Sequence, residues 1–165
     1  IGIGGLGHIA IKLLKAWGCE ITAFSSNLAK KHDLLKMGAH NVQQSDDYQA
    51  MKSYYSQFDL ILSTVNVGLQ WNEYLKLLSP RGAFHFVGAV LTPAQIDPGI
   101  LMARSIQLTG SDTGTPATLK QLLAFAERFQ IRPQVEVFPM SQVNQAIAHL
   151  KSGKTRYRIV LKADF

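Results

Sequence analysis

The sequence predicts an α/β fold of the Rossmann type, a doubly wound parallel sheet, and three observations lead to this prediction. A glycine-rich turn, Gly2–Gly7, has the spacing G-x-G-x-x-G and runs into a helical pattern from about Gly5 to Trp17. Strand and helix patterns then alternate up to Gly110. The strand segments are apolar throughout rather than alternating with polar residues, which is typical of a parallel sheet covered on both faces by helices.

Turn and cap residues separate the other elements. Gly18 ends the first helix, Ser25-Ser26-Asn27 can cap the helix expected at 28–37, and Gly38 ends that second helix. The expected elements are a strand at 21–24, a helix at 28–37, a strand at 40–42, a strand at 60–63, a helix at 69–78, a turn at 80–82, a strand at 83–87, a short segment at 98–103 and a strand at 105–109. Leu60 to Ser63 is expected to be a buried strand.

The two ends of the sequence differ in character from its middle. Only Ile1 precedes the glycine turn, whereas such a turn normally follows a complete strand, so we expect the first strand to be largely missing from a longer chain. After Gly110 the strand–helix alternation of the sheet is not continued. We expect here a helix at 115–129, a strand at 135–138, a helix at 141–150 and a strand at 157–161. We therefore predict a partial nucleotide-binding domain at 1–113 and a segment of another domain at 114–165.

Composition excludes several classes of protein. The 165 residues are 47% hydrophobic, and no apolar run reaches the roughly 18 residues of a membrane span. The single cysteine, Cys19, rules out an internal disulfide framework and a cysteine-built zinc site, and it fits a reducing, cytoplasmic location. The net charge of +6 comes from scattered basic residues, which favours a small anionic ligand over nucleic acid.

The glycines have separate expected roles in binding a dinucleotide. Gly2 allows the tight turn, Gly4 lets the backbone approach a pyrophosphate, and Gly7 lets the helix pack close to the sheet. The helix N-terminus then directs about half a positive charge toward the phosphates. His8, at the start of this helix, is expected to serve the helix face rather than to reach a phosphate. A tight turn without any ligand is the alternative.

The loop after the second strand indicates NADP(H) as the cofactor. An NAD enzyme usually carries Asp or Glu about 20 residues past the glycines, and this sequence has Ser25 and Ser26 there, with Lys30 one turn further on. A carboxylate would repel the 2′-phosphate of NADP, whereas hydroxyls and an ammonium can bind it. Serines that only cap the helix, with solvated lysines, are the alternative.

Motifs along the whole chain resemble those of one family. They are Gly2–Gly7, Phe24-Ser25-Ser26-Asn27, Lys36-Met37-Gly38-Ala39, Phe58-Asp59-Leu60-Ile61, Thr64-Val65-Asn66-Val67, Val87-Gly88-Ala89-Val90, Thr109-Gly110-Ser111 and Arg156-Tyr157-Arg158. The sequence resembles the zinc-dependent medium-chain dehydrogenases, in the cinnamyl-alcohol-dehydrogenase branch, and is most similar to bacterial NADPH-dependent broad-range aldehyde reductases.

The resemblance implies a set of site residues. The backbone of Gly2, Ile3, Gly4, Gly5, Leu6 and Gly7 would surround the pyrophosphate, Ser25, Ser26 and Lys30 would hold the 2′-phosphate, Thr64 and Gly88 would line the cofactor groove, Ser111, Asp112 and Thr113 would lie near the nicotinamide, and Arg158 would reach a phosphate. Residues 114–165 would return to a catalytic domain that carries a catalytic and a structural zinc.

The resemblance also implies the chemistry and the assembly. The reaction would be reversible hydride transfer between NADPH and an aldehyde or primary alcohol, with zinc as Lewis acid. No zinc ligand matches here, so we expect no catalytic or metal-binding residue in this chain and no activity from it alone. Homodimers would form through the strand Ser105–Thr109, an edge without proline or charge. Coverage of this edge by Gly114–Phe165 is the alternative. The alternatives are a zinc-free quinone-reductase-type enzyme and a non-catalytic NADPH-binding protein.

Overall fold

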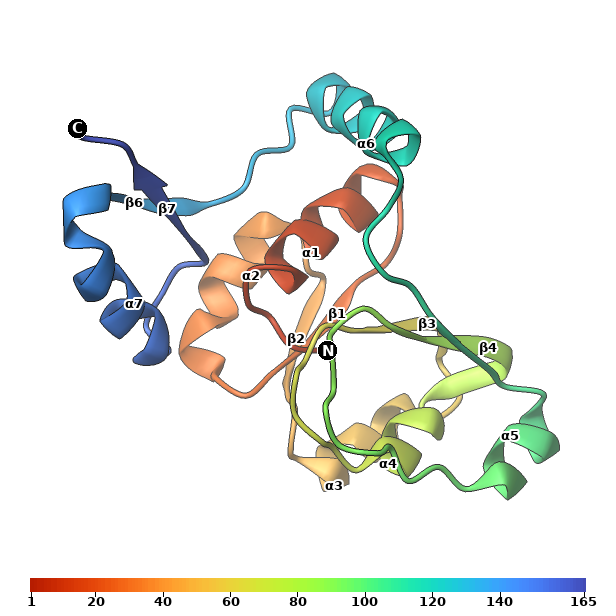
Figure 1. The fold of residues 1–165 in the computed structure, drawn as a ribbon. Helices are drawn as coiled ribbons and strands as arrows, with labels where there is room; N and C mark the ends of the chain where they lie inside the picture. Colours follow the sequence, from red (N-terminus) through yellow and green to blue (C-terminus); the bar gives the residue numbers. More distant parts are fainter.

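The computed structural model describes residues 1–165 as an α/β protein (Figure 1). Its elements are α1 (Gly7–Ala16), β1 (Thr22–Ser25), η1 (Leu28–Lys30), α2 (Lys31–Met37), β2 (Asn41–Gln44), α3 (Tyr48–Met51), η2 (Lys52–Tyr54), β3 (Phe58–Ser63), α4 (Trp71–Leu75), β4 (Leu78–Phe86), α5 (Pro98–Arg104), β5 (Gln107–Gly110), α6 (Pro116–Arg128), β6 (Val135–Pro139), η3 (Met140–Gln142), α7 (Val143–Lys151) and β7 (Arg158–Lys162). None of the helices combines the length and apolar character that a membrane crossing requires.

Every strand pairing is parallel, as the apolar strand patterns predicted. The strands form three groups, β1-β2, β3-β4-β5 and β6-β7. Apolar side chains form two cores around the strands β1 to β4. Ala23 belongs to a core formed with α1 and α2, and its neighbour Phe24 belongs to a second core formed with α3, α4 and β3. Adjacent residues of one strand thus serve opposite faces, which defines a doubly wound arrangement.

The strands β1 and β3 do not pair with each other. A cavity of about 410 Å³ separates these strands. Ile1 and Gly2 bridge the two strands, because the Ile1 nitrogen donates to the Leu62 carbonyl at 2.6 Å and the Gly2 N–H donates to the Phe24 carbonyl at 3.1 Å. The prediction of a buried strand at 60–63 is therefore only half right, since Leu60 borders this cavity and is 47% exposed.

Two element boundaries differ from the sequence prediction. The helix near 69–78 shortens to α4, and Leu78 already begins β4, which runs through the predicted turn at Pro80 with a shift in its register against β3. The strand predicted at Ser105–Thr109 begins two residues later. Ser105 adopts a left-handed conformation, φ 53°, that ends α5, and the strand β5 starts at Gln107. Isolated serine gives no sequence signal of such a conformation.

The C-terminal residues pack as a separate layer. The strands β6 and β7 pair only with each other and carry α7 against one side (Figure 1). The helix α6 has no buried residue and contacts the rest through Phe125, whose ring centroid lies 5.4 Å from that of Trp17. The residues at the start of β6 and β7, namely Gln134, Tyr157 and Arg158, return to the region of the glycine turn, as described below.

Candidate functional site

The glycine turn has the geometry that its spacing predicts. Gly2 has φ +84°, which favours glycine, and a Cβ there would lie 2.5 Å from the Val65 Cγ1 atom. A Cβ on Gly7 would overlap the Gly2 carbonyl oxygen, so the helix α1 approaches the turn as closely as only glycine allows. A Cβ on Gly4 would meet no atom within 4 Å. The turn therefore closes tightly at its ends and leaves open space at Gly4.

Residues at the ends of β3 and β4 hold the turn in place. The Thr64 hydroxyl donates to the carbonyl oxygens of Ile1 and Gly2, at 3.3 Å for Ile1. Gly88 packs against the Thr64–Val65 backbone without room for a Cβ, and its N–H donates to the Ser63 carbonyl at 3.0 Å. The structure thus places Thr64 and Gly88 beside the turn, at the carboxyl edge of the parallel strands, where ligands of such sheets bind.

The two serines after β1 have different environments. Ser25 is buried, and its hydroxyl oxygen accepts the Asn27 N–H at 3.1 Å, whereas Ser26 is exposed. Asn27 caps the following turn by accepting the Ala29 N–H at 2.9 Å, so the capping function predicted for this loop is confirmed at Asn27. Ser25 shapes the loop, and Ser26 presents its hydroxyl to solvent.

Lys30 extends from this loop toward the glycine turn. Its Nζ donates to the Ile3 carbonyl at 3.2 Å and lies 5.4 Å from the centroid of the Tyr157 ring. Burial, followed by the positive charge of Arg156, lowers the pKa of the Lys30 ammonium. A phosphate at this point would stabilise the ammonium form of Lys30.

The C-terminal segment contributes Arg158 to the same place. The guanidinium Nη2 atom of Arg158 lies 3.2 Å from the position that a Cβ on Gly5 would take, and the Tyr157 carbonyl oxygen lies 3.6 Å from it. Arg156 lies near Asp33 of α2, at 3.9 Å between Nε and Oδ2. Lys30 at Ile3 and Arg158 at Gly5 therefore both reach the glycine turn, although they lie 128 positions apart in the sequence.

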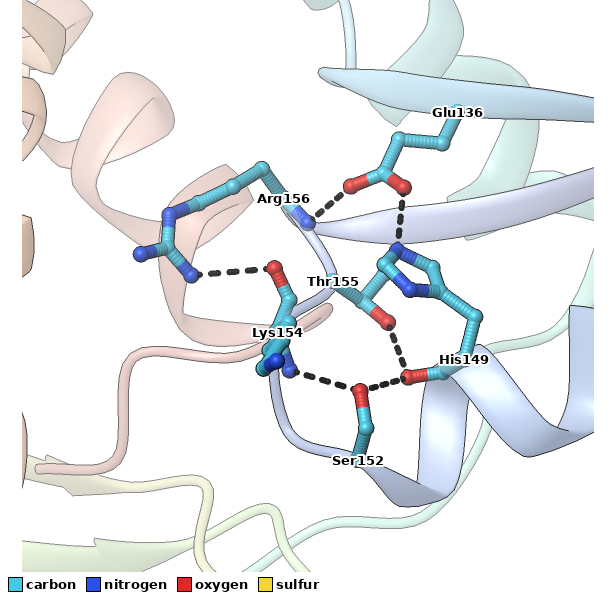
Figure 2. Close-up of polar contacts among 6 residues, drawn as sticks. All are labelled: Glu136, His149, Ser152, Lys154, Thr155 and Arg156. Atoms are coloured by element: carbon cyan, nitrogen blue, oxygen red, sulfur yellow. Dashed lines mark hydrogen bonds and ion pairs between the residues drawn. The ribbon is translucent and has the colours of Figure 1, made fainter.

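A polar network fixes the loop that leads to Arg158 (Figure 2). One carboxylate oxygen of Glu136 accepts the Arg156 N–H, and the other lies 2.6 Å from the His149 Nε2 atom. The His149 carbonyl accepts the Ser152 hydroxyl at 2.7 Å. The Arg156 N–H, followed by His149, holds the pKa of the Glu136 carboxyl below its usual value. The loop before β7 is thus tied to β6 and α7.

The three residues after β5 form a more open group. The Ser111 hydroxyl lies 2.9 Å from the Nε2 atom of His85, and the Nδ1 atom of the same ring lies 2.8 Å from the Thr109 hydroxyl. Asp112 accepts the Thr113 N–H at 2.7 Å. All three are exposed and lie past the carboxyl edge of β5. His85 therefore contacts Ser111 from β4, and no pattern in the sequence indicates this contact.

His8 is the second residue that sequence reasoning left outside the site. Its ring is fully buried, stacks on the Tyr157 ring at 5.0 Å, and accepts the Gln134 N–H at 3.1 Å. The helix-face role predicted for it agrees with this burial. Its position one turn before the buried Ile11 on the same helix face was a signal of burial, but the partners at 134 and 157 had no sequence signal.

Zinc does not fit the donor atoms of this chain. No group of three His, Cys, Asp or Glu side chains lies close enough together to hold a metal ion, and the single cysteine, Cys19, is exposed. The chemistry of a dinucleotide does fit, because Gly4 leaves open space just before α1 and the cations Lys30 and Arg158 lie at the neighbouring residues Ile3 and Gly5. The fold and this edge define a Rossmann-type nucleotide-binding architecture.

The family follows from the sequence. The family model of the zinc-binding dehydrogenases matches residues 5–128, so the chain belongs to this family, and the resemblance inferred from its motifs is confirmed. The aldehyde reductase AdhA of Synechocystis sp. is 48% identical over 161 residues, which are 98% of this chain and 48% of the relative.

Solved structures agree with this assignment. A cinnamyl alcohol dehydrogenase from Sorghum bicolor superposes with a TM-score of 0.93 at 35% identity, over 97% of this chain and 46% of that one. CAD from Helicobacter pylori, solved complexed with NADP(H), superposes with a TM-score of 0.83 at 26% identity, over 97% and 46%. The Rossmann fold class is confirmed. The chain spans about half the length of the curated relatives it matches.

Proposed function

We propose that this chain is the NADP(H)-binding part of a zinc-dependent oxidoreductase that interconverts small aldehydes and primary alcohols. The observation that carries the proposal is the glycine turn, open at Gly4 and bordered by Lys30 and Arg158. The family supports it, since the relatives include an aldehyde reductase and a cinnamyl alcohol dehydrogenase. Zinc, in this proposal, is held by residues outside this chain.

NADP(H) rather than NAD(H) is the proposed cofactor. The loop after β1 carries Ser25 and Ser26 without a carboxylate, and Lys30, the last residue of η1, places its ammonium at the Ile3 carbonyl of the glycine turn. A hydrogen bond to a charged group contributes about 1.5–3 kcal/mol, which suffices to favour a 2′-phosphate over a 2′-hydroxyl. The complex of the Helicobacter pylori protein with NADP(H) supports the same choice.

The residues of this chain would bind and orient the cofactor. The backbone of Gly2, Ile3, Gly4, Gly5, Leu6 and Gly7 and the N-terminus of α1 would receive the pyrophosphate, Ser26 and Lys30 with the loop-shaping Ser25 would receive the 2′-phosphate, Thr64 and Gly88 would line the groove, Ser111, Asp112 and Thr113 would border the nicotinamide end, and Arg158 would neutralise phosphate charge. When bound, NADPH supplies the hydride.

Domain organisation, assembly and location are part of the same proposal. Residues 1–113 would form the nucleotide-binding domain and 114–165 the return to the catalytic domain. Strand β5 is the unpaired edge of its sheet and all its residues are exposed, which favours a homodimer that pairs this strand with its copy. The free, exposed Cys19 favours the reducing cytoplasm.

The test is a comparison of NADPH and NADH binding to this chain by calorimetry. We expect tighter NADPH binding, and we expect Ser26→Asp and Lys30→Met each to weaken NADPH about tenfold or more while changing NADH little, since 1.4 kcal/mol corresponds to a factor of ten. Lys31→Met, at the exposed first residue of α2, is the matched control. Equal or tighter binding of NADH would contradict the proposed specificity.

A further inference from the structure

His8 lies in a buried space between the glycine turn and the C-terminal segment. Its side chain has no exposed area. The Nδ1 atom lies 3.2 Å from the Gly4 carbonyl oxygen, and the Nε2 atom lies 3.1 Å from the Gln134 nitrogen, 126 residues away. The ring plane lies at 14° to that of Tyr157, so the two rings stack. The His8 side chain thus contacts the glycine turn at Gly4 and the C-terminal segment at Gln134 and Tyr157.

The two hydrogen bonds fix the state of the ring. The Gln134 N–H can only donate, so Nε2 must accept and carries no proton. The Gly4 carbonyl can only accept, so the proton lies on Nδ1. Only the neutral tautomer with Nδ1–H satisfies both partners, because a protonated ring would direct an N–H against the N–H of Gln134.

Charges on the surrounding elements favour the same neutral state. Lys12 of α1 and Arg158 of β7 face the ring, Lys30 and Arg156 lie over the stacked Tyr157, and the carboxylate Asp33 lies further off beside Arg156. Burial chiefly lowers the pKa of His8, and the charges of Lys12 and Arg158 lower it further against the opposing hydrogen bond to Gly4. The ring therefore remains an acceptor for Gln134 at neutral pH.

The contact continues from His8 to Arg158. The Gln134 carbonyl accepts the Tyr157 N–H at 3.2 Å, and Tyr157 directly precedes Arg158, whose guanidinium lies over Gly5. A continuous path of contacts therefore runs from the Gly4 carbonyl through His8, Gln134 and Tyr157 to the one C-terminal cation at the turn. The Glu136–His149 network in Figure 2 fixes the same loop from its other side.

We propose that His8 is a positioning residue that docks the segments at Gln134 and Tyr157 on the glycine turn and thereby holds Arg158 at the pyrophosphate position. The part that concerns nucleotide affinity rests on the proposed function, and the docking itself does not. His8 contacts no phosphate in this proposal. It acts through Arg158, so its effect on NADPH binding must disappear when Arg158 is removed.

The side chains of Asn and Gln separate the two hydrogen bonds of His8. In His8→Asn an amide nitrogen replaces Nδ1 and keeps the bond to Gly4, whereas nothing reaches Gln134. In His8→Gln the amide oxygen can take the place of Nε2 and accept the Gln134 N–H. We expect His8→Asn to weaken NADPH about tenfold and His8→Gln to remain within a few-fold of the parent, given the energy of a charged hydrogen bond.

A double-mutant cycle with Arg158→Ala tests the route of action. Arg158→Ala should weaken NADPH about as much as His8→Asn does, and the double variant no more than either alone. The control is His40→Ala, which also removes a histidine acceptor of a backbone N–H, that of Ile21 at 3.0 Å, but lies away from the turn. It should leave NADPH binding unchanged. Additive losses in the cycle would overturn the proposal.

Two measurements do not depend on nucleotide binding. Nitrogen-15 NMR of the unaltered chain should show one histidine in the neutral Nδ1–H tautomer. The signal of this histidine should be absent from the spectrum of His8→Asn. An Nε2–H tautomer for His8 would overturn the proposal even if the variants fail to fold. Hydrogen exchange should show that His8→Asn exposes the amides of Gln134 and Tyr157, and unchanged protection would overturn it. A chain that binds no NADPH but passes both measurements refutes only the proposed function.

Discussion

The sharpest prediction concerns Gly4, because the structure separates its role in binding from any role in folding. A Cβ on Gly4 would meet no atom within 4 Å, and its φ lies outside the left-handed range. Gly4→Ala should therefore change the free energy of unfolding by less than about 1 kcal/mol, in the direction of greater stability, because alanine restricts the unfolded chain more than glycine does.

The same methyl group would occupy the space that a pyrophosphate needs. Backbone N–H groups at such turns approach phosphate oxygens at hydrogen-bond distance, about 2.9 Å, which leaves no room for a carbon atom between them. Loss of one such bond to a charged group costs about 1.5–3 kcal/mol. We therefore expect Gly4→Ala to weaken NADPH binding by at least tenfold, measured by calorimetry on the chain.

Gly7→Ala is the matched control, because we expect it to lower the stability of the fold, which Gly4→Ala should not do. Its Cβ would overlap the Gly2 carbonyl oxygen, so α1 or the turn must move. Overpacking of this kind costs about 1–3 kcal/mol of stability, which urea denaturation measures. If Gly4→Ala binds NADPH as tightly as the parent while Gly7→Ala is destabilised, the turn is a structural device and the pyrophosphate lies elsewhere.

Three further predictions follow from other parts of the chain. Glu136→Gln should lower stability at neutral pH, because the folded-state pKa of Glu136 lies below its unfolded value of about 4.3. This stabilisation is present above the unfolded value and is lost as pH falls through the folded pKa, so the denaturation curves of parent and variant should converge at acid pH, and a difference that does not shrink as pH falls would contradict the reasoning. Leu108→Pro should yield a monomer in sedimentation experiments, because it removes an N–H that would pair with the second copy. The Ser111 N–H donates to the Phe86 carbonyl, and strand alternation then directs the Leu108 N–H away from β4. A parent that is monomeric at micromolar concentration would refute the dimer. The chain with NADPH, aldehydes and added zinc should show no turnover, since it gathers no three metal donors, and turnover at an ordinary dehydrogenase rate would place the chemistry within it.

Local sequence patterns determined the fold class and the centre of the candidate site. The spacing of Gly2, Gly4 and Gly7 predicted a tight turn with one open position, and the structure has that geometry. Apolar strands separated by helical patterns predicted parallel pairing, which all the strand pairs show. These features could be predicted because glycine conformation and strand burial depend on residues that are close together in the sequence.

Element boundaries were less predictable, since they depend on single backbone conformations. Ser105 adopts a left-handed conformation that ends α5, and β4 passes through Pro80 instead of turning there. Serine does not generally adopt a left-handed conformation, and proline is not a usual residue in the middle of a strand. Packing of Leu78 and Ile106 into the core, both of them buried, outweighs the local preference at these positions.

Only the tertiary structure decided which side chains surround the glycine turn. The sequence alone does not distinguish buried Ser25 from exposed Ser26, nor does it show that His8 accepts a hydrogen bond from Gln134. Arg158 reaches Gly5 because β7 pairs with β6 and Tyr157 stacks on His8, contacts between residues more than a hundred positions apart or on different elements. Such contacts depend on how whole elements dock, and no local pattern of residues encodes that geometry.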